Sequence, residues 1–567
     1  MDLQSKTRFN KAPTITKRRT RFDLSHPVLT TFNTGDFVNV FCEPVYPGET
    51  HSLKTSSLTR LETSLHQTMD NAYIEFAFFF VPLKTVFSDF DKFLGANDDP
   101  WTQSTEYHLP QILMGEDDDY VAAPVSVNSL LNHLMFPVGS YGGDGYDSVL
   151  SYDATPLFSV FQVWNDWYRD ENYDSIIYFS KDGSDVFLDT GYLLNGAIFN
   201  PSTDTLKVNR FKDVFSTALP APQKGQEITF GLAGLAPLVV GDELYDLGGD
   251  LRLGVSGTLS SQLYALGINN TAGGDGKNGG IRPLSGEVNS ISGTGAVTKT
   301  NLLTDLGSSS AITINQLRLA ITAQAIAERD ARGGTRLKEK TYATWGVHVN
   351  DLEIDRSEFL GGKRFPVSMM EVLQTSETGT TVLGTDAGHS KTVDASESFV
   401  RSFTQYGWIL GFMYVRTSRN YSQGIDRKFR NKSIYDLYDP MLDNIGELPV
   451  LKSELYAVDA NTSTGVSTAN SVFGYQEAWY HLKERTGRFS GYFQPGISGT
   501  LDSWHYGDNY NSSPQASASW LKEGADNVDR TIAVSSNAAF QWTANIYFEY
   551  YATRTMAKYS IPNTFGF

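Results

Sequence analysis

Polar and apolar residues alternate most regularly near the end of the chain, between 540 and 550. Successive side chains of a β-strand point to opposite faces, so an alternation with a period of two indicates a strand with one buried and one solvated face. The pattern therefore predicts a half-buried strand here. Its apolar positions are Phe540, Trp542, Ala544, Ile546, Phe548 and Tyr550, and the polar positions between them include Gln541, Thr543, Asn545 and Glu549.

Three other stretches are rich in aromatic and β-branched residues and predict buried strands. Two of them, 37–41 and 73–81, lie near the beginning of the chain and are bounded by Gly or Pro. The third, 399–416, is too apolar for one solvent-facing strand and predicts one or two buried strands. Strands at both ends of a chain indicate one antiparallel sandwich that distant segments complete, as in jelly rolls.

Helical periodicity is limited to three stretches, 85–94, 157–168 and 313–332. The last begins with a possible capping box, Thr313 and Gln316, and is stopped by Gly333-Gly334. We interpret the charged residues 328–332 as a turn and the segment from there to Gly361-Gly362 as a loop. The fold class predicted from these patterns is mainly β, with long loop insertions and a few short helices.

The stretch 226–310 differs from the rest of the chain because it is rich in Gly, Ser, Thr and Asn and poor in charge. One interpretation is a disordered linker. The other is an ordered surface excursion of short strands and turns, which the apolar residues 235–240 and 251–255 favour. We expect this stretch to contribute little to the sandwich core.

Charge is distributed unevenly along the sequence. The chain has 46 basic and 64 acidic side chains and a net charge of −18, which is the wrong sign for a surface that follows nucleic acid throughout. Residues 1–22 are the exception, because seven cations face the single carboxylate of Asp2, giving +6 and leaving −24 for the remainder. These cations are Lys6, Arg8, Lys11, Lys17, Arg18, Arg19 and Arg21.

The basic N-terminal arm predicts contact with a polyanion. Its cations would displace the counterions of a nucleic-acid strand, and Phe9 could stack on a base. Pro13 and the neighbouring Thr residues disfavour a helix, so we expect the arm to be extended. Two alternatives remain open: a solvated tail, or an arm that ties neighbouring subunits together.

Catalytic and metal-binding patterns are missing from the sequence. It has neither paired Cys/His spacing suited to zinc nor an HExxH or G-x-S-x-G motif, so we expect no enzyme activity, cofactor or metal ion. We interpret His505, next to Asp502 and Ser503, as a packing residue. The single Cys42 excludes an internal disulfide and is expected to be a buried, inert thiol. Without a secretory leader or membrane span, a reducing cytoplasm is the expected site of synthesis.

Several blocks combine Trp, Pro, Met or paired Gly in fixed arrangements and together span most of the chain. They include a block within 26–82 that ends MDNAYIEFAFFFVP, then VWNDWYRDEN at 163–172, FSTALPAPQKG at 215–225, RDARGGTR at 329–336, GWILGFMYVRTSRNYSQGIDRKF at 407–429, LDSWHYGD at 501–508 and VDRTIAVSS at 528–536. In their amino-acid sequence and in their order along the chain, these blocks resemble the major capsid proteins of small single-stranded DNA bacteriophages, the Microviridae, and in particular the gokushovirus branch.

The resemblance implies a single eight-stranded antiparallel jelly roll of the viral capsid type, with insertions larger than the sandwich. It divides the chain into a basic arm (1–22), the first part of the jelly roll (23–225), a surface insertion that builds an outer protrusion (226–310) and the remainder of the jelly roll (311–567). The implied function is that of a structural protein that self-assembles into a small T=1 icosahedral shell around circular single-stranded DNA.

The resemblance also implies partners and contact residues. Implied partners are other copies of the chain, the genome, a small basic DNA-binding protein, a pilot protein, an internal scaffolding protein and a host cell-surface receptor, with assembly in the bacterial cytoplasm and the virion capsid as destination. Aromatic and Arg side chains of the matching blocks are candidates for subunit contacts or for core packing. These are Trp101, Trp164, Trp167, Arg329, Arg332, Arg336, Trp345, Arg427 and Trp504. The alternative function is a carbohydrate-binding or carbohydrate-cleaving β-sandwich protein.

Overall fold

The fold is mainly β, with several antiparallel sheets and few helices. A computed structural model describes residues 18–96, 107–114, 124–140, 150–188, 190–225, 314–334, 336–351, 355–373, 386–443, 445–457, 471–533 and 540–559, together with short strands between 238 and 304. Contacts group the chain into two compact units, Met1–Pro222 with Asp330–Phe567, and Gln223–Arg329. Each unit is described by itself.

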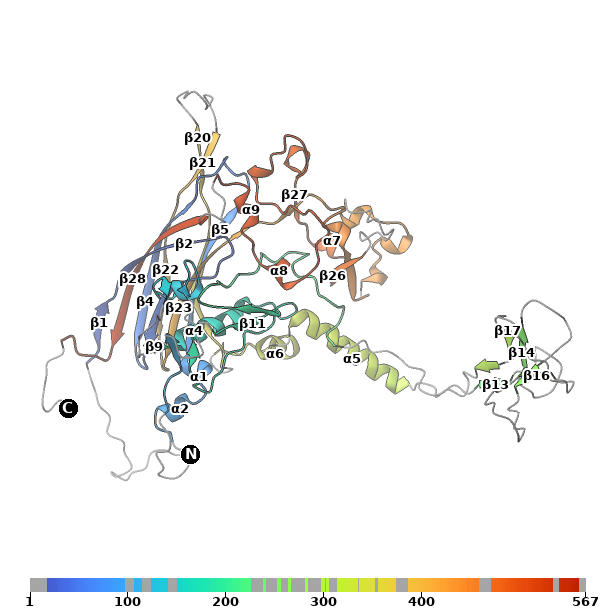
Figure 1. Cartoon of the computed structure of the whole chain (residues 1–567), viewed down its shortest axis with the longest axis horizontal. Helices are drawn as coiled ribbons and strands as arrows, with labels where there is room; N and C mark the ends of the chain where they lie inside the picture. The colour runs from blue at the N-terminus through green and yellow to red at the C-terminus, as the bar shows by residue number, and fades with distance from the viewer. Residues whose placement is uncertain are drawn as a thin grey trace. The chain divides into compact units, whose positions relative to one another are not determined.

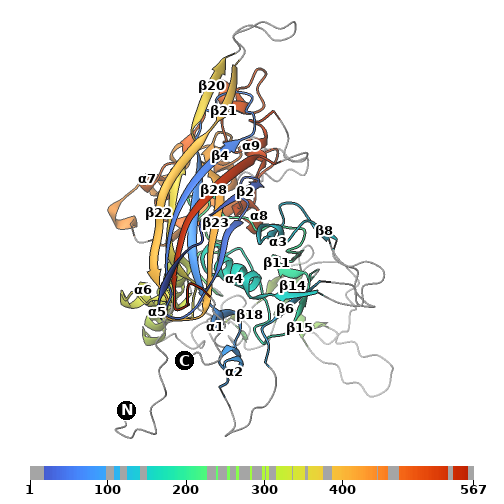
Figure 2. The same ribbon diagram turned by 90° about the vertical axis from the view of Figure 1, so that its left-hand side faces the viewer.

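Two large antiparallel sheets form the centre of the first unit, and their long strands run side by side in Figures 1 and 2. In the first sheet β28 pairs on one side with β1 and β2 and on the other with β4, which pairs with β22. The order in the second sheet is β19-β5-β23-β3. The first sheet contains β1 (Thr20–Asp23), β2 (His26–Phe32), β4 (Thr50–Leu61), β22 (Thr392–Ser402) and β28 (Trp542–Arg554); the second contains β3 (Val38–Val45), β5 (Ala72–Pro82), β19 (Glu358–Pro366) and β23 (Gly407–Thr417).

The strand predicted near the end of the chain is confirmed as β28. Trp542, Ala544, Ile546, Phe548 and Tyr550 have no exposed surface, whereas Tyr547 on the opposite face is 48% exposed. The alternation of polar and apolar residues therefore predicted both the strand and its buried face correctly. The predicted strands 37–41 and 73–81 correspond to β3 and β5, and the stretch 399–416 contains two strands, the end of β22 and most of β23.

A hydrophobic core lies between the two sheets and is largely aromatic. The ring of Phe41, from β3, lies 5.1 Å from each of the rings of Phe548 and Tyr550, from β28. Phe78, from β5, reaches Phe399 of β22 at 5.9 Å. These contacts join the second sheet to the first, so packing across this core holds the sandwich together.

Strands β5 and β23 are buried on both faces. Alternate residues of β5, such as Phe78 and Phe80, enter the core between the sheets, while Phe79 and Val81 enter a second core on the other side. That second core is closed by α4 (Thr155–Val163) and the π-helical turn η2 (Trp164–Tyr168). Burial on both faces explains why these two strands are continuously apolar in sequence.

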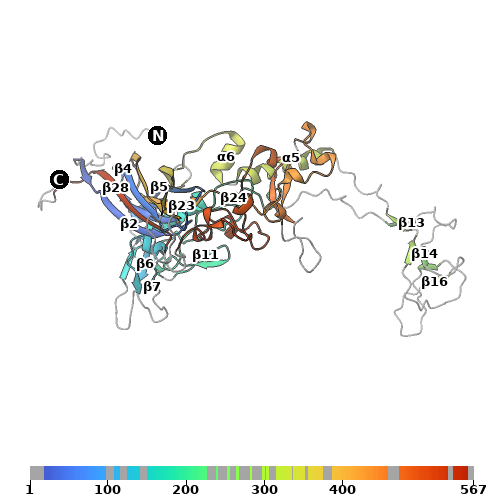
Figure 3. The same cartoon turned by 90° about the horizontal axis from the view of Figure 1, so that it is seen from above.

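Smaller elements fill the connections of the first unit, and Figure 3 shows the segments between β24 and β28 extending from the two large sheets. A third core, which includes Phe215, Tyr421, Phe473 and Trp520, holds these segments together. The small sheets are β10-β6-β9, β11-β12, β7-β8, β20-β21, β24-β27 and β25-β26. Their strands are β6 (Gln111–Met114), β7 (Pro124–Val125), β8 (Gly139–Ser140), β9 (Leu150–Asp153), β10 (Val186–Phe187), β11 (Tyr192–Leu194), β12 (Ala197–Phe199), β20 (Met369–Leu373), β21 (Asp386–Ser390), β24 (Asn420–Tyr421), β25 (Glu447–Leu451), β26 (Val472–Glu477) and β27 (Gly487–Arg488).

The helices of the first unit, apart from α4 and the equally long α6, are single short turns. Besides α4, the helices are α1 (Leu83–Val86), α2 (Phe90–Phe93), α3 (Leu130–His133), α6 (Leu337–Trp345), α7 (Tyr480–Lys483), α8 (Ala518–Leu521) and α9 (Asp526–Asp529). The helix predicted over 85–94 is wrong as a single element, because α1 ends at Val86 and α2 begins at Phe90. Between them the Ser88 N–H donates to the carbonyl of Lys181 (2.8 Å), which replaces a helical hydrogen bond.

The second unit contains a two-stranded and a four-stranded antiparallel sheet and most of α5 (Ile314–Gly333). It begins close to the predicted insertion 226–310 and extends further, through Arg329. Its strands are β13 (Leu238–Val240), β14 (Arg252–Val255), β15 (Tyr264–Leu266), β16 (Ile281–Pro283), β17 (Val297–Thr300) and β18 (Leu302–Thr304). Short strands are what the second of the two interpretations expected for this stretch, an ordered surface excursion instead of a disordered linker.

The sequence between α5 and β19 was partly misread. The helix expected over 313–332 is confirmed as α5, so residues 328–332 are helical and do not form the charged turn that was also expected. The helix stops at the predicted glycines, with Gly334 in the left-handed conformation (φ +80°). The expected loop contains α6, which ends at Gly346, another left-handed glycine whose N–H donates to the carbonyl of Tyr342. Leu, Lys, Glu and Ala favour this helix, and the mixed aromatic and basic composition obscured it.

The core between the sheets should dominate stability, and neighbouring residues of β28 provide a matched test. Phe548→Ala should lower the free energy of unfolding by about 3–5 kcal/mol, because it opens a cavity among aromatic rings. Tyr547→Ala, on the exposed face of the same strand, should change it by less than about 1 kcal/mol. Urea unfolding of the unassembled subunit measures both, and similar losses would contradict the assignment of faces.

Candidate functional site

Trp164 and Trp167 lie on the π-helical turn that follows α4, but they have different surroundings. Trp164 has no exposed surface, donates from Nε1 to the carbonyl of Lys207 (3.2 Å) and carries the Lys522 ammonium over its ring at 4.7 Å. It therefore packs inside the subunit and cannot itself contact a neighbour, which corrects its candidacy as an interface residue. Trp167 is partly buried and donates to Ser357, with the Arg356 guanidinium 4.4 Å above its ring.

Arg336 joins the start of α6 to this turn. Its guanidinium lies 2.8 Å from the carboxylate of Glu171 and donates to the carbonyls of Asn165 (2.8 Å) and Arg169 (3.2 Å). Arg332, at the end of α5, pairs with Glu447. The two arginines on either side of the glycine pair therefore meet carboxylates and carbonyls from distant segments of the same subunit.

The other candidate contact residues are dispersed. Trp345 ends α6 and is 77% exposed, so its indole is available to a partner. Trp504 stacks on His66 with ring centroids 4.7 Å apart. Arg427 donates to the carbonyl of Pro449 (2.6 Å). Arg329 lies in α5, and Trp101 falls outside the described residues.

The basic arm is described only at its end. Arg18 and Arg19 are exposed, and the residues from Thr20 onward belong to β1, which pairs with β28. Arg21 places its guanidinium 3.9 Å above the ring of Tyr551, so this cation is held against the sheet. The remaining candidates for nucleic-acid binding, Lys6, Arg8, Phe9, Lys11 and Lys17, fall outside the described residues.

A buried ion network that the sequence did not single out centres on Asp508. One carboxylate oxygen pairs with Arg210 (2.8 Å) and accepts from the Tyr510 hydroxyl (2.6 Å), while the other pairs with Arg419 and accepts from Asn527 (2.7 Å). Arg419 also pairs with the buried carboxylate of Glu523 at 2.7 Å. The network thus links the chain after β12, the end of β23 and the segment before β28.

The charge state of Asp508 follows from these partners. Burial alone would raise the pKa of its carboxyl, but Arg419 and Arg210, with hydrogen bonds from Tyr510 and Asn527, hold that pKa well below its usual range. Asp508 is therefore ionised at neutral pH. The only sequence signal for the network was that Asp508 and Arg419 lie in blocks that resemble one protein family.

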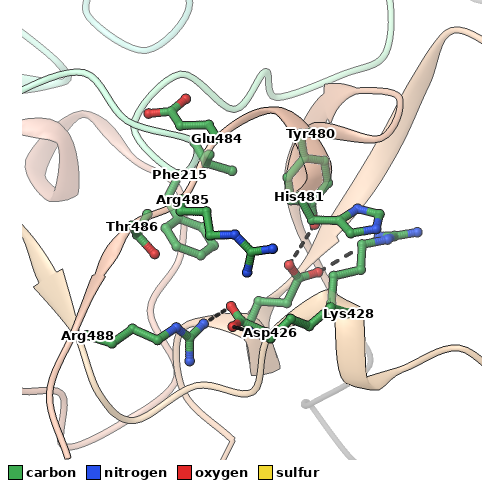
Figure 4. A pocket seen from close by; sticks show the side chains of 12 residues that line it. Phe215, Asp426, Lys428, Tyr480, His481, Glu484, Arg485, Thr486 and Arg488 are labelled. Atoms are coloured by element: carbon green, nitrogen blue, oxygen red, sulfur yellow. Dashed lines mark hydrogen bonds and ion pairs between the residues drawn. The ribbon is translucent and has the colours of Figure 1, made fainter.

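A pocket of about 190 Å³ opens beside the third core and is lined mainly by charged side chains (Figure 4). Asp426 pairs with Arg488, and Tyr480 donates its hydroxyl proton to Glu454 at 2.6 Å. Arg485 points into the pocket and forms no hydrogen bond or ion pair with any residue that the structure describes. The pocket therefore offers a cation and the rings of Phe215 and Tyr480 to a group from outside.

Two residues considered in the search for catalytic chemistry have packing roles. His505 is buried, stacks on Phe489 at 3.8 Å and bonds through Nε2 to the carbonyl of Phe493 (2.8 Å), in agreement with its interpretation as a packing residue. Cys42 is partly buried against the second core, and burial together with Glu43 and Asp153 raises the pKa of its thiol. That thiol is protonated and unreactive at neutral pH.

Among the residues that the structure describes, no group of three or more His, Cys, Asp or Glu side chains is arranged to hold a metal ion. Of the helices in the same residues, none combines the length and apolarity needed to cross a bilayer.

Comparison with known proteins covers almost the whole chain. A family model described as "Capsid protein (F protein)" matches residues 10–564. The chain is 32% identical to capsid protein VP1 of Spiroplasma virus 4, over 96% of this chain and 95% of that protein. It is 30% identical to capsid protein VP1 of Chlamydia phage 1 (98% and 97% covered) and 28% identical to that of Bdellovibrio phage phiMH2K (98% of each).

The buried network predicts a large loss of stability when its central carboxylate is removed. Asp508→Ala should lower the free energy of unfolding by about 3–5 kcal/mol, because it leaves Arg419 and Arg210 without a counter-charge in a buried site. The matched control is Glu477→Ala, which removes half of an exposed pair with Lys483 and should cost about 0–1 kcal/mol. Chemical unfolding at pH 7 compares the two variants with the parent.

The same network predicts the direction of a pH effect. Because the folded state lowers the pKa of Asp508, its contribution is present above the ordinary carboxyl pKa of about 4 and is lost as the pH falls below it. The parent should therefore lose more stability than Asp508→Ala between pH 5 and pH 2. Parallel losses in the two proteins would contradict an ionised Asp508.

Proposed function

Because the chain belongs to the F-type capsid protein family and is a structural major capsid protein of the microvirus type, we propose that it builds a small T=1 icosahedral shell around a circular single-stranded DNA genome. The observation that carries this proposal is the family match over residues 10–564, supported by two relatives at 30% identity or more over nearly their full lengths. It leaves no separate domain for the alternative carbohydrate-binding or carbohydrate-cleaving function.

We infer that the eight long strands β2, β3, β4, β5, β19, β22, β23 and β28 form a capsid-type jelly roll. The pairing pattern supports this inference. In chain order the first of these strands pairs with the last (β2 with β28), the second with the seventh, the third with the sixth and the fourth with the fifth. A long hairpin that is rolled up gives this pattern, and a jelly roll has eight strands in two sheets.

The second compact unit, Gln223–Arg329, is proposed to be the outer protrusion. Low charge and high Gly, Ser and Thr content over 226–310 suit a surface excursion. The contact grouping supports the proposal, because this unit has its own sheets and separates from the unit that contains the sandwich.

We propose that the basic arm lies on the inside of the shell and contacts the genome. An acidic body repels DNA, and the arm contains the cations that a packaged strand needs to displace its counterions. A small basic DNA-binding protein, a pilot protein, an internal scaffolding protein and a host receptor remain proposed partners, with assembly in the bacterial cytoplasm. Among the candidate contact residues, exposed Trp345 is the best supported for a contact between copies.

Electron cryo-microscopy of the purified chain tests the shell. Closed particles of uniform diameter and icosahedral symmetry are expected, with density for Gln223–Arg329 outside the sandwich layer. A chain that stays monomeric at all concentrations, or that binds or hydrolyses glycans, would count against the shell. Density for Gln223–Arg329 between sandwich sheets would count against the protrusion alone.

Charge reversal tests the arm. Changing Lys17, Arg18, Arg19 and Arg21 together to Glu should lower the DNA content or yield of particles. The difference from the parent should shrink as salt is raised, because the parent releases more counterions on binding and therefore loses more affinity. The matched control exchanges Lys for Arg and Arg for Lys at the same four positions, which keeps the charge. Filled particles at the parental yield, or binding of antibodies against residues 1–22 to intact virions, would contradict an internal arm.

A further inference from the structure

The segment 425–443 exposes an unusual amount of apolar surface for part of an ordered chain. No residue in this stretch, which is described throughout, is buried. Phe429, Ile434, Tyr435 and Met441 are 73%, 77%, 76% and 92% exposed, and Leu437 and Tyr438 are about half exposed. Contiguous exposed apolar groups of this kind mark an interaction site.

This segment, which we call the 425–443 surface, is held in a fixed shape by its own hydrogen bonds. It forms three short 3₁₀ turns, η5 (Arg427–Phe429), η6 (Ile434–Asp436) and η7 (Pro440–Leu442), which Figure 1 draws in orange beside α7. Asp436 accepts from the backbone N–H groups of Lys432 (2.9 Å) and Ser433 (2.7 Å), and Asp439 accepts from that of Met441 (2.8 Å). The carboxylates cap these turns, so little conformational entropy is lost when a partner binds.

Both ends of the surface are anchored to the subunit. Arg427 donates to the carbonyl of Pro449, and the indole of Trp479 donates to the carbonyl of Leu442 (2.9 Å). The ring of Tyr438 also meets that of Trp479 edge-on at 5.4 Å. The backbone is thus attached to the third core while the apolar side chains face outward.

The chemistry of the surface favours a protein partner over nucleic acid. Ile434, Leu437 and Met441 are aliphatic and do not stack on bases. The segment contains four carboxylates and four cations, so it offers no net positive charge to a phosphate backbone. A centre of aliphatic and aromatic side chains with charges at its margins is the composition of a protein–protein contact.

One margin of the surface is complementary in charge to the rest of the chain. Residues 427–432 contain four cations and no carboxylate in a chain whose net charge is −18. The pocket of Figure 4 adjoins this margin, because Asp426, Arg427 and Lys428 also line it. Arg485 is exposed at the pocket and forms no ion pair with any described residue, so an incoming carboxylate would pair with it there.

We propose that the 425–443 surface docks against a second copy of this chain, and that the adjoining pocket receives a carboxylate side chain of that copy through Arg485. The inference rests on the proposed function, because a shell places identical acidic copies side by side. The contact is heterologous, since an apolar surface with a basic margin on one copy meets a different, acidic surface on the next. The segment and the pocket then serve contact between subunits rather than binding of the DNA genome.

Paired substitutions test the apolar part. Ile434→Asp with Met441→Asp should lower the yield of particles, or the association constant of subunits, by about tenfold or more, because two desolvated apolar contacts become charged. The unassembled variant should unfold at the same urea concentration as the parent, since both side chains are exposed. The matched control, Ile434→Leu with Met441→Leu, should assemble as the parent does. Assembly of the Asp variant at the parental level would overturn the proposal.

A matched pair at Arg485 tests the pocket. Arg485→Glu should weaken association by about tenfold, because the incoming carboxylate meets a like charge. Arg485→Lys keeps the cation and should retain most of the association. Equal assembly of the two variants would overturn the role of the pocket.

Photo-cross-linking identifies the occupant. Tyr435→p-benzoylphenylalanine, irradiated at increasing subunit concentration in the presence of single-stranded DNA, should give covalent chain–chain adducts whose second site lies on an acidic segment of another copy. Adducts within one chain or with DNA would overturn the proposal. Particles that form without the chain–chain adduct would contradict this contact but not the proposed shell. The adduct without particles would contradict the shell but not the contact.

Discussion

Burial of β5 and β23 on both faces is the constraint on which the rest of the structure depends. One face of each strand closes the core of the sandwich, and the other forms the floor of the second core under α4. Gly411 shows how tightly these layers fit, because a Cβ at this position would lie 2.6 Å from the ring of Phe78 and 2.8 Å from the Cβ of Phe41. The long connections that cover the second core are therefore attached to the sandwich through two strands, β5 and β23, that are buried on both faces.

The connections require a second kind of attachment, because most of their residues lie outside these two cores. Buried ion pairs supply it. Asp508 is held by Arg210 and Arg419. Glu75 of β5 holds Arg416 (2.6 Å), whose guanidinium also donates to the carbonyl of Asn209 (3.3 Å) in the chain after β12. Charge pairs of this kind add less net stability than apolar packing, but breaking one is costly, so they fix which segments meet. A subunit built mainly of connections is thereby restricted to one arrangement of them.

The sequence predicted those parts of the fold in which local periodicity and burial agree. Alternation from Trp542 to Tyr550 gave the element and its buried face, and the aromatic and β-branched run of β5 gave a strand, whose burial on both faces only the structure shows. Failures occurred where a tertiary contact overrode the local pattern. The helix over 85–94 breaks because Ser88 bonds to Lys181, and Trp164 is a core residue because α4 turns it toward Lys207.

The sites were harder to predict than the fold. The arginines of the RDARGGTR block were marked only as candidates for subunit contacts or core packing, and Arg332 and Arg336 meet carboxylates from distant segments of the same chain. No periodicity, however, connects Asp508 with Arg210, or Arg485 with Phe215, because each pair is separated by some 270 residues or more and meets only in the folded chain. Resemblance to a family marked several of the segments involved, but it could not show which side chains meet.

A protein that assembles with itself must expose apolar surface and still remain soluble as a free subunit. The net charge of −18 contributes to this balance, because like-charged subunits repel one another unless specific groups of opposite charge meet. The cations of residues 427–432 belong to the same segment as several highly exposed apolar side chains, and its residues 426–428 line the pocket with Arg485, which forms no ion pair with a described residue. Apolar contact there is favourable only in the orientation that also brings a carboxylate to Arg485, so the charge selects the orientation while the apolar groups supply the free energy of binding.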